Sequence, residues 1–145
     1  MNLKWDESYS VGIRSFDDQH KKLFEIVNIL CLLVKTRTAW DPLGKDAMSE
    51  VLQDLRQYTK IHFETEERAM RTHGYADYEN HKKEHDRFAG MVDEFILRFT
   101  NKQRFNKDGV MLTVEVLNAA IKWLDEHLNG TDKLYSAFLI GKGVR

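Results

Sequence analysis

Apolar residues recur at steps of three and four along most of this chain, and no other feature constrains its fold as strongly. This spacing places the apolar residues on one face of an α-helix. Proline, which interrupts helices, occurs only once, as Pro42, and the 145 residues include only eight glycines. The sequence therefore predicts an all-α fold.

Four amphipathic helices are expected. The first helix is expected to begin after Asp17, a suitable N-cap. The second is expected to begin near Asp41-Pro42 and to have Gly74 at its C′ position. Each helix has an inward-facing stripe of residues spaced three or four apart. In chain order the four stripes are His20, Phe24, Val27, Cys31 and Val34; Met48, Leu52, Leu55, Tyr58, His62, Glu66 and Met70; His81, His85, Phe88, Val92, Phe95 and Phe99; and Thr113, Leu117, Ala120, Leu124 and His127.

The connections between these helices are short, which favours an antiparallel up-down-up-down four-helix bundle. Residues 1–16 lack the helical period and are expected to form an N-terminal arm lying on the bundle. Residues 101–109 are expected to form a loop, and the segment after Gly130 a short C-terminal helix. We expect a single domain over residues 1–145.

Composition narrows the function classes. The chain carries 22 basic and 23 acidic residues, a formal net charge of -1, which disfavours a nucleic-acid partner. The single cysteine, Cys31, excludes an internal disulfide and is expected to be a small buried hydrophobe. No apolar run approaches a membrane span, and the N-terminus lacks the apolar region of a signal peptide. A cytoplasmic location is therefore expected.

Histidines and a glutamate interrupt these otherwise apolar stripes. His62 and Glu66 are four residues apart and share a helix face, as do His81 and His85. In an antiparallel bundle, the starts of the first and third helices meet the ends of the second and fourth. His20 lies near such a start and His127 near such an end, so all six side chains are expected at one level.

Such a layer is difficult to bury without a metal, because an unpartnered buried polar group costs roughly 2–7 kcal/mol. One metal would not use so many ligands, whereas two metals with bridging carboxylates would. Asp132 is the candidate second carboxylate. It lies five residues after His127, about 140° away on a regular helix. A π-type turn or a helix break at Asn129-Gly130 would bring it to the site.

Other dinuclear and zinc patterns do not match. No Glu stands three residues before a histidine, as carboxylate-rich di-iron bundles require, and there is no HExxH motif. Imidazole ligands suit iron, zinc and manganese, and spacing does not choose among these metals.

The segments "DDQH", "HFETEERAM", "HKKEH" and "WLDEHLNGTDKLY", in this order, closely resemble the hemerythrin family. The opening "KWDESYSVGIRSFDDQHKKL" resembles the arm of its bacterial branch. The resemblance runs from Trp5 to about Tyr135. It implies a four-helix bundle that binds O2 reversibly at a non-haem di-iron centre bridged by an oxo or hydroxo group.

The resemblance also implies a ligand set. His20 and His62 would hold one iron, which keeps an open position for O2. The other iron would be held by three histidines, and two carboxylates would bridge the pair. These ligands would be His81, His85 and His127, with Glu66 and Asp132 as the bridges.

The leading functional interpretation is O2 storage or delivery in a bacterial cytoplasm, with an oxygen-consuming enzyme as the candidate recipient, and not an enzyme activity. Sensing is an alternative that would need a separate partner, because the chain ends soon after the last motif. Peroxide or nitric oxide chemistry at the same irons is another. Iron storage and a plain helical interaction module rank lower.

Three further polar residues lie close in sequence to the candidate ligands but are not themselves assigned as ligands. His73 lies in a predicted turn and is expected to be exposed and not a ligand. Glu67 is expected at the surface or behind a ligand. Asn129 either reaches the O2 pocket, where it would speed autoxidation, or faces solvent at the end of a helix.

Overall fold

The computed structural model describes residues 3–36, 42–100 and 102–145. Within these residues the chain forms helices and no strand, which confirms the all-α prediction. The elements are the 3-10 helix η1 (Glu7–Tyr9) and the α-helices α1 (Arg14–Lys35), α2 (Pro42–Thr72), α3 (Tyr78–Thr100), α4 (Lys102–Asn129) and α5 (Thr131–Gly141).

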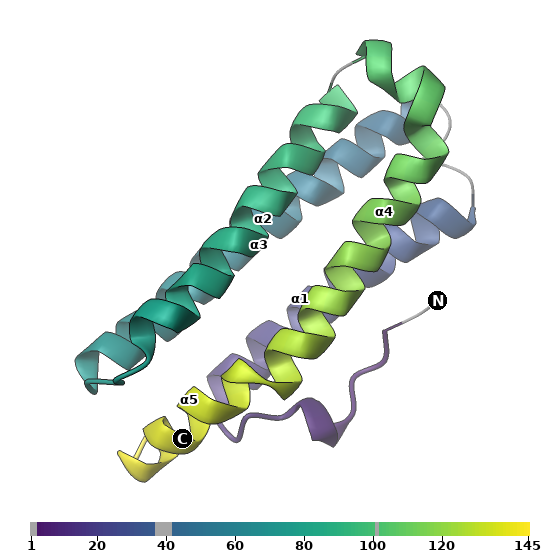
Figure 1. Cartoon of the computed structure of the whole chain (residues 1–145). Helices are drawn as coiled ribbons and strands as arrows, with labels where there is room; N and C mark the ends of the chain where they lie inside the picture. Colours follow the sequence, from purple (N-terminus) through teal and green to yellow (C-terminus); the bar gives the residue numbers. More distant parts are fainter. Residues whose placement is uncertain (1–2, 37–41, 101) are drawn as a thin grey trace.

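Helices α1 to α4 lie along one long axis, and consecutive helices run in opposite directions (Figure 1). Helix α1 contacts α2 and α4, and α3 contacts the same two helices. This is the expected up-down-up-down bundle. The short helix α5 continues beyond α4 at the end where α2 connects to α3 (Figure 1). No helix in the described part of the chain is both long and apolar enough to cross a membrane.

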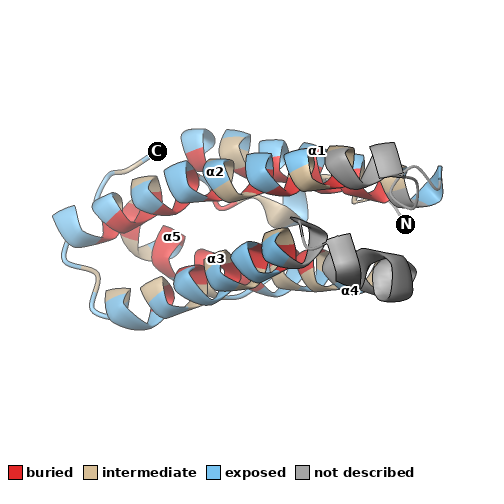
Figure 2. Ribbon diagram, turned by 90° about the horizontal axis from the view of Figure 1, so that it is seen from above, coloured by how far each residue is buried: buried red, intermediate tan, exposed pale blue. Residues whose placement is uncertain are grey.

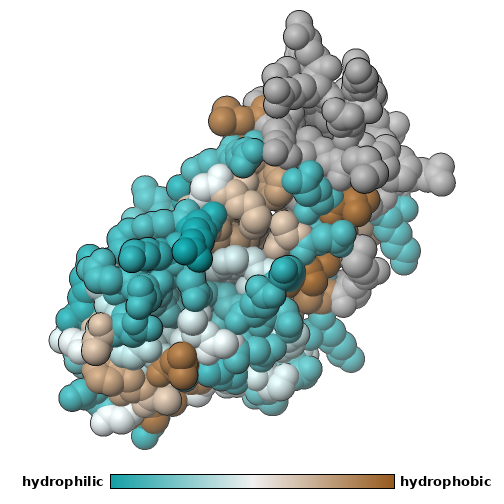
Figure 3. Space-filling model, viewed as in Figure 1, coloured by the Kyte–Doolittle hydropathy of each residue, from teal (hydrophilic) through white to brown (hydrophobic). Residues whose placement is uncertain are grey.

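The apolar stripes face one another inside the bundle (Figure 2). Cys31 is buried with them, as expected. The side chains over α3 on the face seen in Figure 3 are mainly hydrophilic, as an amphipathic helix requires. The core residues exposed by no more than 1% include Leu23, Val27, Leu30, Met48, Leu52, Leu55, Phe88, Leu117, Leu124 and Leu128.

A second apolar cluster lies at the α5 end of the bundle. It joins the arm to α5 through Val11, Ile13, Phe16, Met70, Tyr135 and Leu139. Along α1, Phe16 belongs to this cluster and Phe24 to the main core, with His20 between them. The polar layer is therefore enclosed by apolar side chains on both sides.

The N-terminal arm lies on the bundle, as predicted. Trp5 packs edge-on against Phe24, with ring centroids 5.6 Å apart. The Leu3 amide donates to Asn28 Oδ1 at 2.8 Å, and Asn28 Nδ2 donates to the Leu3 carbonyl at 2.7 Å. These contacts fix the arm against α1.

The predicted start of the first helix is wrong, because α1 begins at Arg14 and contains Asp17 in its first turn. The Asp17 carboxylate accepts hydrogen bonds from the Val11 amide at 2.8 Å and the Ser10 hydroxyl at 2.6 Å. It therefore stabilises the end of the arm instead of capping its own helix. The carbonyl of Ile13 accepts the first helical hydrogen bonds.

The end of α2 is as predicted. Gly74 has a φ of 71°, and the Tyr75 amide donates to the Met70 carbonyl at 2.9 Å. The Gly74 amide donates to the Arg71 carbonyl at 3.2 Å, which completes a Schellman motif. The start of α2 at Pro42 also agrees with prediction, whereas Asp41 lies outside the described residues.

The expected loop at residues 101–109 is wrong, because α4 already begins at Lys102. The sequence of this segment lacks an apolar stripe. Lysine, glutamine and arginine are nevertheless good helix formers, so such a segment can still be helical. Position 101 and the side chains of Val34, Phe99 and Thr113 lie outside the described part of the structure.

Candidate metal centre

Seven polar side chains meet between the two apolar clusters, each exposed by no more than 3%. They are the seven that the sequence singled out as candidate ligands. They come from all five α-helices: His20 from α1, His62 and Glu66 from α2, His81 and His85 from α3, His127 from α4, and Asp132 from α5.

The seven residues form two overlapping groups. In each group, one candidate ligand atom per residue lies within 4.8 Å of all the others. Glu66 and Asp132 belong to both groups. The first group adds His20 and His62, and the second adds His81, His85 and His127.

Glu66 presents one oxygen to each group. Its Oε1 lies 2.7 Å from His62 Nε2 and 3.2 Å from His20 Nε2. Its Oε2 lies 3.1 Å from His85 Nε2 and 3.6 Å from His81 Nε2. A carboxylate in this position can bridge two ions.

Asp132 spans the groups in the same way. Its Oδ1 lies 2.8 Å from His127 Nε2 and 3.2 Å from His81 Nε2. Its Oδ2 lies 3.4 Å from His20 Nε2. Each of the five histidines thus directs Nε2 at a shared carboxylate.

Asp132 reaches the cluster because the helix breaks at Gly130, as predicted. Helix α4 ends at Asn129, and α5 begins at Thr131. Gly130 has φ -105° and ψ -99°, and a Cβ added there would lie 2.5 Å from the carbonyl oxygen of Glu126. Glycine is the residue that allows this turn of the chain.

Three of the rings are held from behind. The Nδ1 of His62 donates to Gln19 Oε1 at 2.6 Å. The Nδ1 atoms of His85 and His127 donate to carboxylates, Glu67 Oε1 and Glu84 Oε2, each at 2.9 Å. Because these oxygens only accept, Nδ1 carries the proton. In the neutral ring, Nε2 then directs a lone pair into the cluster, as a metal ligand must.

The sequence reasoning did not find Gln19 or Glu84 and left the place of Glu67 open. A signal exists, because each stands next to a cluster residue: Gln19 beside His20, Glu67 beside Glu66, and Glu84 beside His85. A residue one position from an inward-facing side chain points about 100° away on the helix and can meet a neighbouring helix.

Tyr135 is a further inner residue that the sequence did not reveal. It is fully buried, and its hydroxyl donates to Glu66 Oε1 at 2.7 Å. Burial and the negative charges of Glu66 and Asp132 raise the pKa of the Tyr135 phenol well above its ordinary value. The hydroxyl therefore keeps its proton and remains a donor.

The cluster strongly perturbs its titratable groups. Burial and the Glu66 charge raise the pKa of Asp132, but His127 and His81 outweigh them and lower it to about 2. Burial alone would lower the pKa of His127, but the carboxylates of Asp132 and Glu84 outweigh burial and raise this pKa to about 10. Carboxylates thus stay ionised and hold protons on nearby rings. A metal that binds there would displace these protons.

Several atoms of the cluster lack a proper hydrogen bond. Among the described residues, His81 Nε2, Glu66 Oε2 and both carboxylate oxygens of Asp132 are buried without a well-aligned partner. A buried charged group without a partner lowers the stability of the fold by roughly several kcal/mol. These orphaned donor atoms fit a bound metal, which would satisfy all of them at once.

Aromatic rings pack behind the three-histidine group. Phe63 stacks on His85, with centroids 3.9 Å apart and an interplanar angle of 7°. Trp123 stacks on His127 at 4.3 Å and 18°, and contacts Phe88 at 4.1 Å. These contacts hold the rings of His85 and His127 in place.

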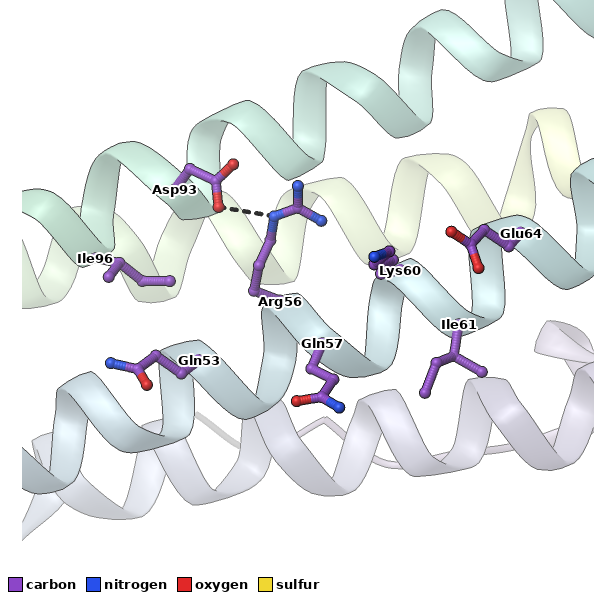
Figure 4. A pocket seen from close by; sticks show the side chains of 8 residues that line it. All are labelled: Gln53, Arg56, Gln57, Lys60, Ile61, Glu64, Asp93 and Ile96. Atoms are coloured by element: carbon purple, nitrogen blue, oxygen red, sulfur yellow. Dashed lines mark hydrogen bonds and ion pairs between the residues drawn. The ribbon is translucent and has the colours of Figure 1, made fainter.

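The surface pockets differ in how close they come to the cluster. One of about 540 Å³ runs between α2 and α3, where Arg56 donates to Asp93 at 2.7 Å (Figure 4). Its lining combines polar and charged side chains with Ile61 and Ile96 and contains no cluster residue. A pocket of about 290 Å³ opens beside His127 and is lined by Glu84, Arg87, Trp123, Glu126, His127, Gly130 and Thr131.

The remaining local expectations have clear outcomes. His73 stands outside both groups of candidate ligands, but it is half-buried and not exposed as expected. Asn129 is exposed, and its amide donates to Asp125 Oδ1 at 3.0 Å. The interpretation that Asn129 reaches an inner pocket is therefore wrong, because its side chain turns outward at the end of α4. Leu128 is the buried neighbour.

Comparisons with known proteins agree with this geometry. Residues 11–139 match the family described as Hemerythrin HHE cation binding domain. The bacteriohemerythrin of Clostridium acetobutylicum is 30% identical over 131 residues, covering 90% of this chain and 96% of that protein. The myohemerythrin of Theromyzon tessulatum is 29% identical over 138 residues, covering 94% and 92%.

A solved structure is also similar. The crystal structure of wild-type hemerythrin superposes with a TM-score of 0.73 at 29% identity, covering 94% of this chain and 97% of that one. Fold and site together define a four-helix-bundle protein whose buried cluster of histidines and carboxylates suits a metal centre. The chain belongs to the hemerythrin family.

Proposed function

We propose that the cluster holds two iron ions and that the chain binds O2 reversibly for storage or delivery. The observation that carries this proposal is the overlap of the two groups of candidate ligands, which share Glu66 and Asp132. Two ions that shared these carboxylates would each also have histidines of their own. Membership of the hemerythrin family supports iron as the metal.

The proposed assignment follows the two groups. His20 and His62 would hold one ion, His81, His85 and His127 the other, and an oxo or hydroxo group would complete the bridge made by Glu66 and Asp132. The bound iron pair would supply the electrons and the open coordination position that reversible O2 binding requires. With only His20 and His62 on one ion, that half would supply the open position for O2.

The residues around the cluster have separate tasks. Gln19, Glu67 and Glu84 accept the Nδ1 protons and orient the rings. Tyr135 keeps its proton on its own oxygen and donates to Glu66. The apolar clusters close both ends of the site along the bundle, and its seven candidate ligands are exposed by no more than 3%. A dry site disfavours separation of charge, which would favour release of the ligand as neutral O2.

Sensing and peroxide or nitric oxide chemistry would use the same inner residues. No feature of the described residues favours these activities over carriage. We therefore propose a carrier without enzyme activity, located in the cytoplasm and delivering O2 to an oxygen-consuming enzyme.

The test begins with the reduced, iron-loaded chain without oxygen. We expect two irons per chain and a visible charge-transfer band that appears with O2 and disappears on evacuation. His85→Ala should lower the iron content and abolish the band, whereas the matched change His73→Ala, outside the cluster, should leave both intact. A chain without bound iron would overturn the metal centre. A centre that oxidises at once, without a reversible band, would overturn carriage.

A further inference from the structure

The two halves of the proposed centre differ in the charge that stands behind their rings. In the three-histidine half, His85 and His127 donate to the carboxylates of Glu67 and Glu84. In the two-histidine half, His62 donates to the neutral amide oxygen of Gln19. The Nδ1 of His20 is buried and has no hydrogen-bond partner among the described residues.

The shared carboxylate of Glu66 is also unequal at its two ends. Tyr135 donates to Oε1, which is the oxygen nearest His62 and His20. Oε2, which faces His85, receives no well-aligned hydrogen bond from the described residues. A hydrogen bond draws negative charge from the oxygen that accepts it. Glu66 is therefore the better metal donor on the three-histidine side.

These differences act in the same direction. An imidazole that donates Nδ1–H to a carboxylate is a more basic ligand through Nε2 than one that donates to an amide. Two carboxylates close behind the rings also attract a divalent cation directly. The same half has one more histidine than the other.

Both outer carboxylates also border solvent. Glu84 lines the pocket of about 290 Å³ beside His127. Glu67 and His85 line a second pocket, of about 540 Å³, between α2 and α3. Two approaches from the surface therefore lead to the three-histidine half.

We propose that the centre binds its two metal ions unequally and in a set order. The half formed by His81, His85 and His127 fills first and releases its ion last, and Glu67 and Glu84 are the positioning residues that set this order. The proposal rests on the proposed dinuclear centre and adds a half-loaded form with one ion at a defined place. It concerns divalent cations in general.

The test uses the full chain loaded with Zn²⁺, which is diamagnetic, and an added chelator at rising concentration. Long-range ¹H–¹⁵N correlation spectra of the histidine rings report which Nε2 atoms remain bound to metal. We expect the His20 and His62 signals to lose zinc first. The signals of the three-histidine half should change only at about tenfold or more higher chelator activity.

Variants of the outer residues separate charge from structure. Glu84→Gln and Glu67→Gln should each weaken retention in the three-histidine half by about 10–100-fold, with smaller changes in the other half. Gln19→Glu should strengthen retention in the two-histidine half. Glu126→Gln is the matched control, because Glu126 lines the same pocket as Glu84 but pairs with Lys122 at 3.8 Å. It removes an equal charge and should change neither step.

The outcomes distinguish the inference from the proposed function. Two bound zinc ions that leave together, or loss first from the three-histidine half, would overturn the order and leave the dinuclear centre intact. Unequal release that is unaffected by Glu67→Gln and Glu84→Gln would overturn the role of these residues. Failure of all five rings to bind zinc would overturn the centre itself. Helical circular dichroism of each loaded variant verifies that it is folded.

Discussion

The Tyr135 hydroxyl lies 2.7 Å from Glu66 Oε1 and donates to it across 69 positions of sequence. Tyr135 and Asp132 both belong to α5, so this short helix supplies one carboxylate to the cluster and a hydrogen bond to the other. The break at Gly130 therefore positions two inner residues. The arm and α5 also form the apolar cluster that closes this end of the bundle.

Replacing Tyr135 by Phe tests that hydrogen bond. The ring can keep its packing against Phe16, whose centroid lies 6.0 Å away, while Glu66 loses a buried donor. A hydrogen bond to a charged group contributes about 1.5–3 kcal/mol, so the free energy of unfolding should fall by about this amount. Urea denaturation of the metal-free chain measures it. Tyr75→Phe, outside the cluster, is the control and should change stability little; equal losses in the two variants would contradict the prediction.

A side chain at Gly130 should disturb the helix break. The added Cβ of Gly130→Ala would lie 2.5 Å from the Glu126 carbonyl oxygen, so the backbone must shift and Asp132 with it. We expect fewer than two irons per chain and a lower melting temperature. Gly90→Ala is the control, because no atom lies within 4 Å of its added Cβ and alanine favours the helix by up to about 1 kcal/mol. A Gly130→Ala chain that binds iron normally would show that the break tolerates a Cβ.

Asp132→Asn tests the second shared carboxylate. The amide removes the negative charge that faces His127, His81 and His20. We expect the iron content to fall below two per chain and the oxygenated band to be lost, as measured by metal analysis and visible spectroscopy. Asp125→Asn, an exposed position of α4, should bind iron as the unchanged chain does. Full occupancy in Asp132→Asn would refute a bridging role.

The metal-free chain should be most stable between about pH 4.5 and 6.5, because folding shifts the pKa values of His127 and Glu84 in opposite directions. The pKa of His127 is raised from 6.5 to about 10, so its contribution is full below the lower value and is lost as pH rises toward the upper one. A hydrogen bond from His127 lowers the pKa of Glu84 from 4.5 to about 2, so its contribution is lost as pH falls through that range.

Urea denaturation at several pH values between about 3 and 10 checks this optimum. In Glu84→Gln, stability should depend less on pH on both sides, because one of the two carboxylates that face His127 is then neutral and Asp132 alone remains. Stability that rises steadily from pH 6.5 to 10 would contradict the assigned pKa of His127.

Local patterns predicted most of the bundle. The helical period depends only on neighbours in the chain, so it placed the stripes, and the glycine and proline positions marked the ends of α2 correctly. The same reasoning placed α1 too late and missed the first turns of α4. Asp17 stabilises the arm instead of capping its own helix, and its hydrogen-bond partners depend on how the arm packs against the bundle.

Six of the seven candidate ligands were also accessible from helical spacing in the sequence. Their levels follow from antiparallel order alone, because a bundle of nearly equal helices brings alternate ends together. Asp132 was the exception, since its place depends on the backbone at Gly130. The outward turn of Asn129 and the half-buried position of His73 were likewise outside the reach of periodicity.

The sequence by itself thus determined the helices, the layer of histidines and the resemblance to hemerythrins, because these follow from residue type and spacing. Only the tertiary structure decided which side chain stands behind which ring: Gln19 behind His62, Glu67 behind His85 and Glu84 behind His127. These pairs join different helices, and their contacts depend on how far each helix is rotated and shifted against its neighbour. That offset is set by packing of the whole core and is not written in any one helix.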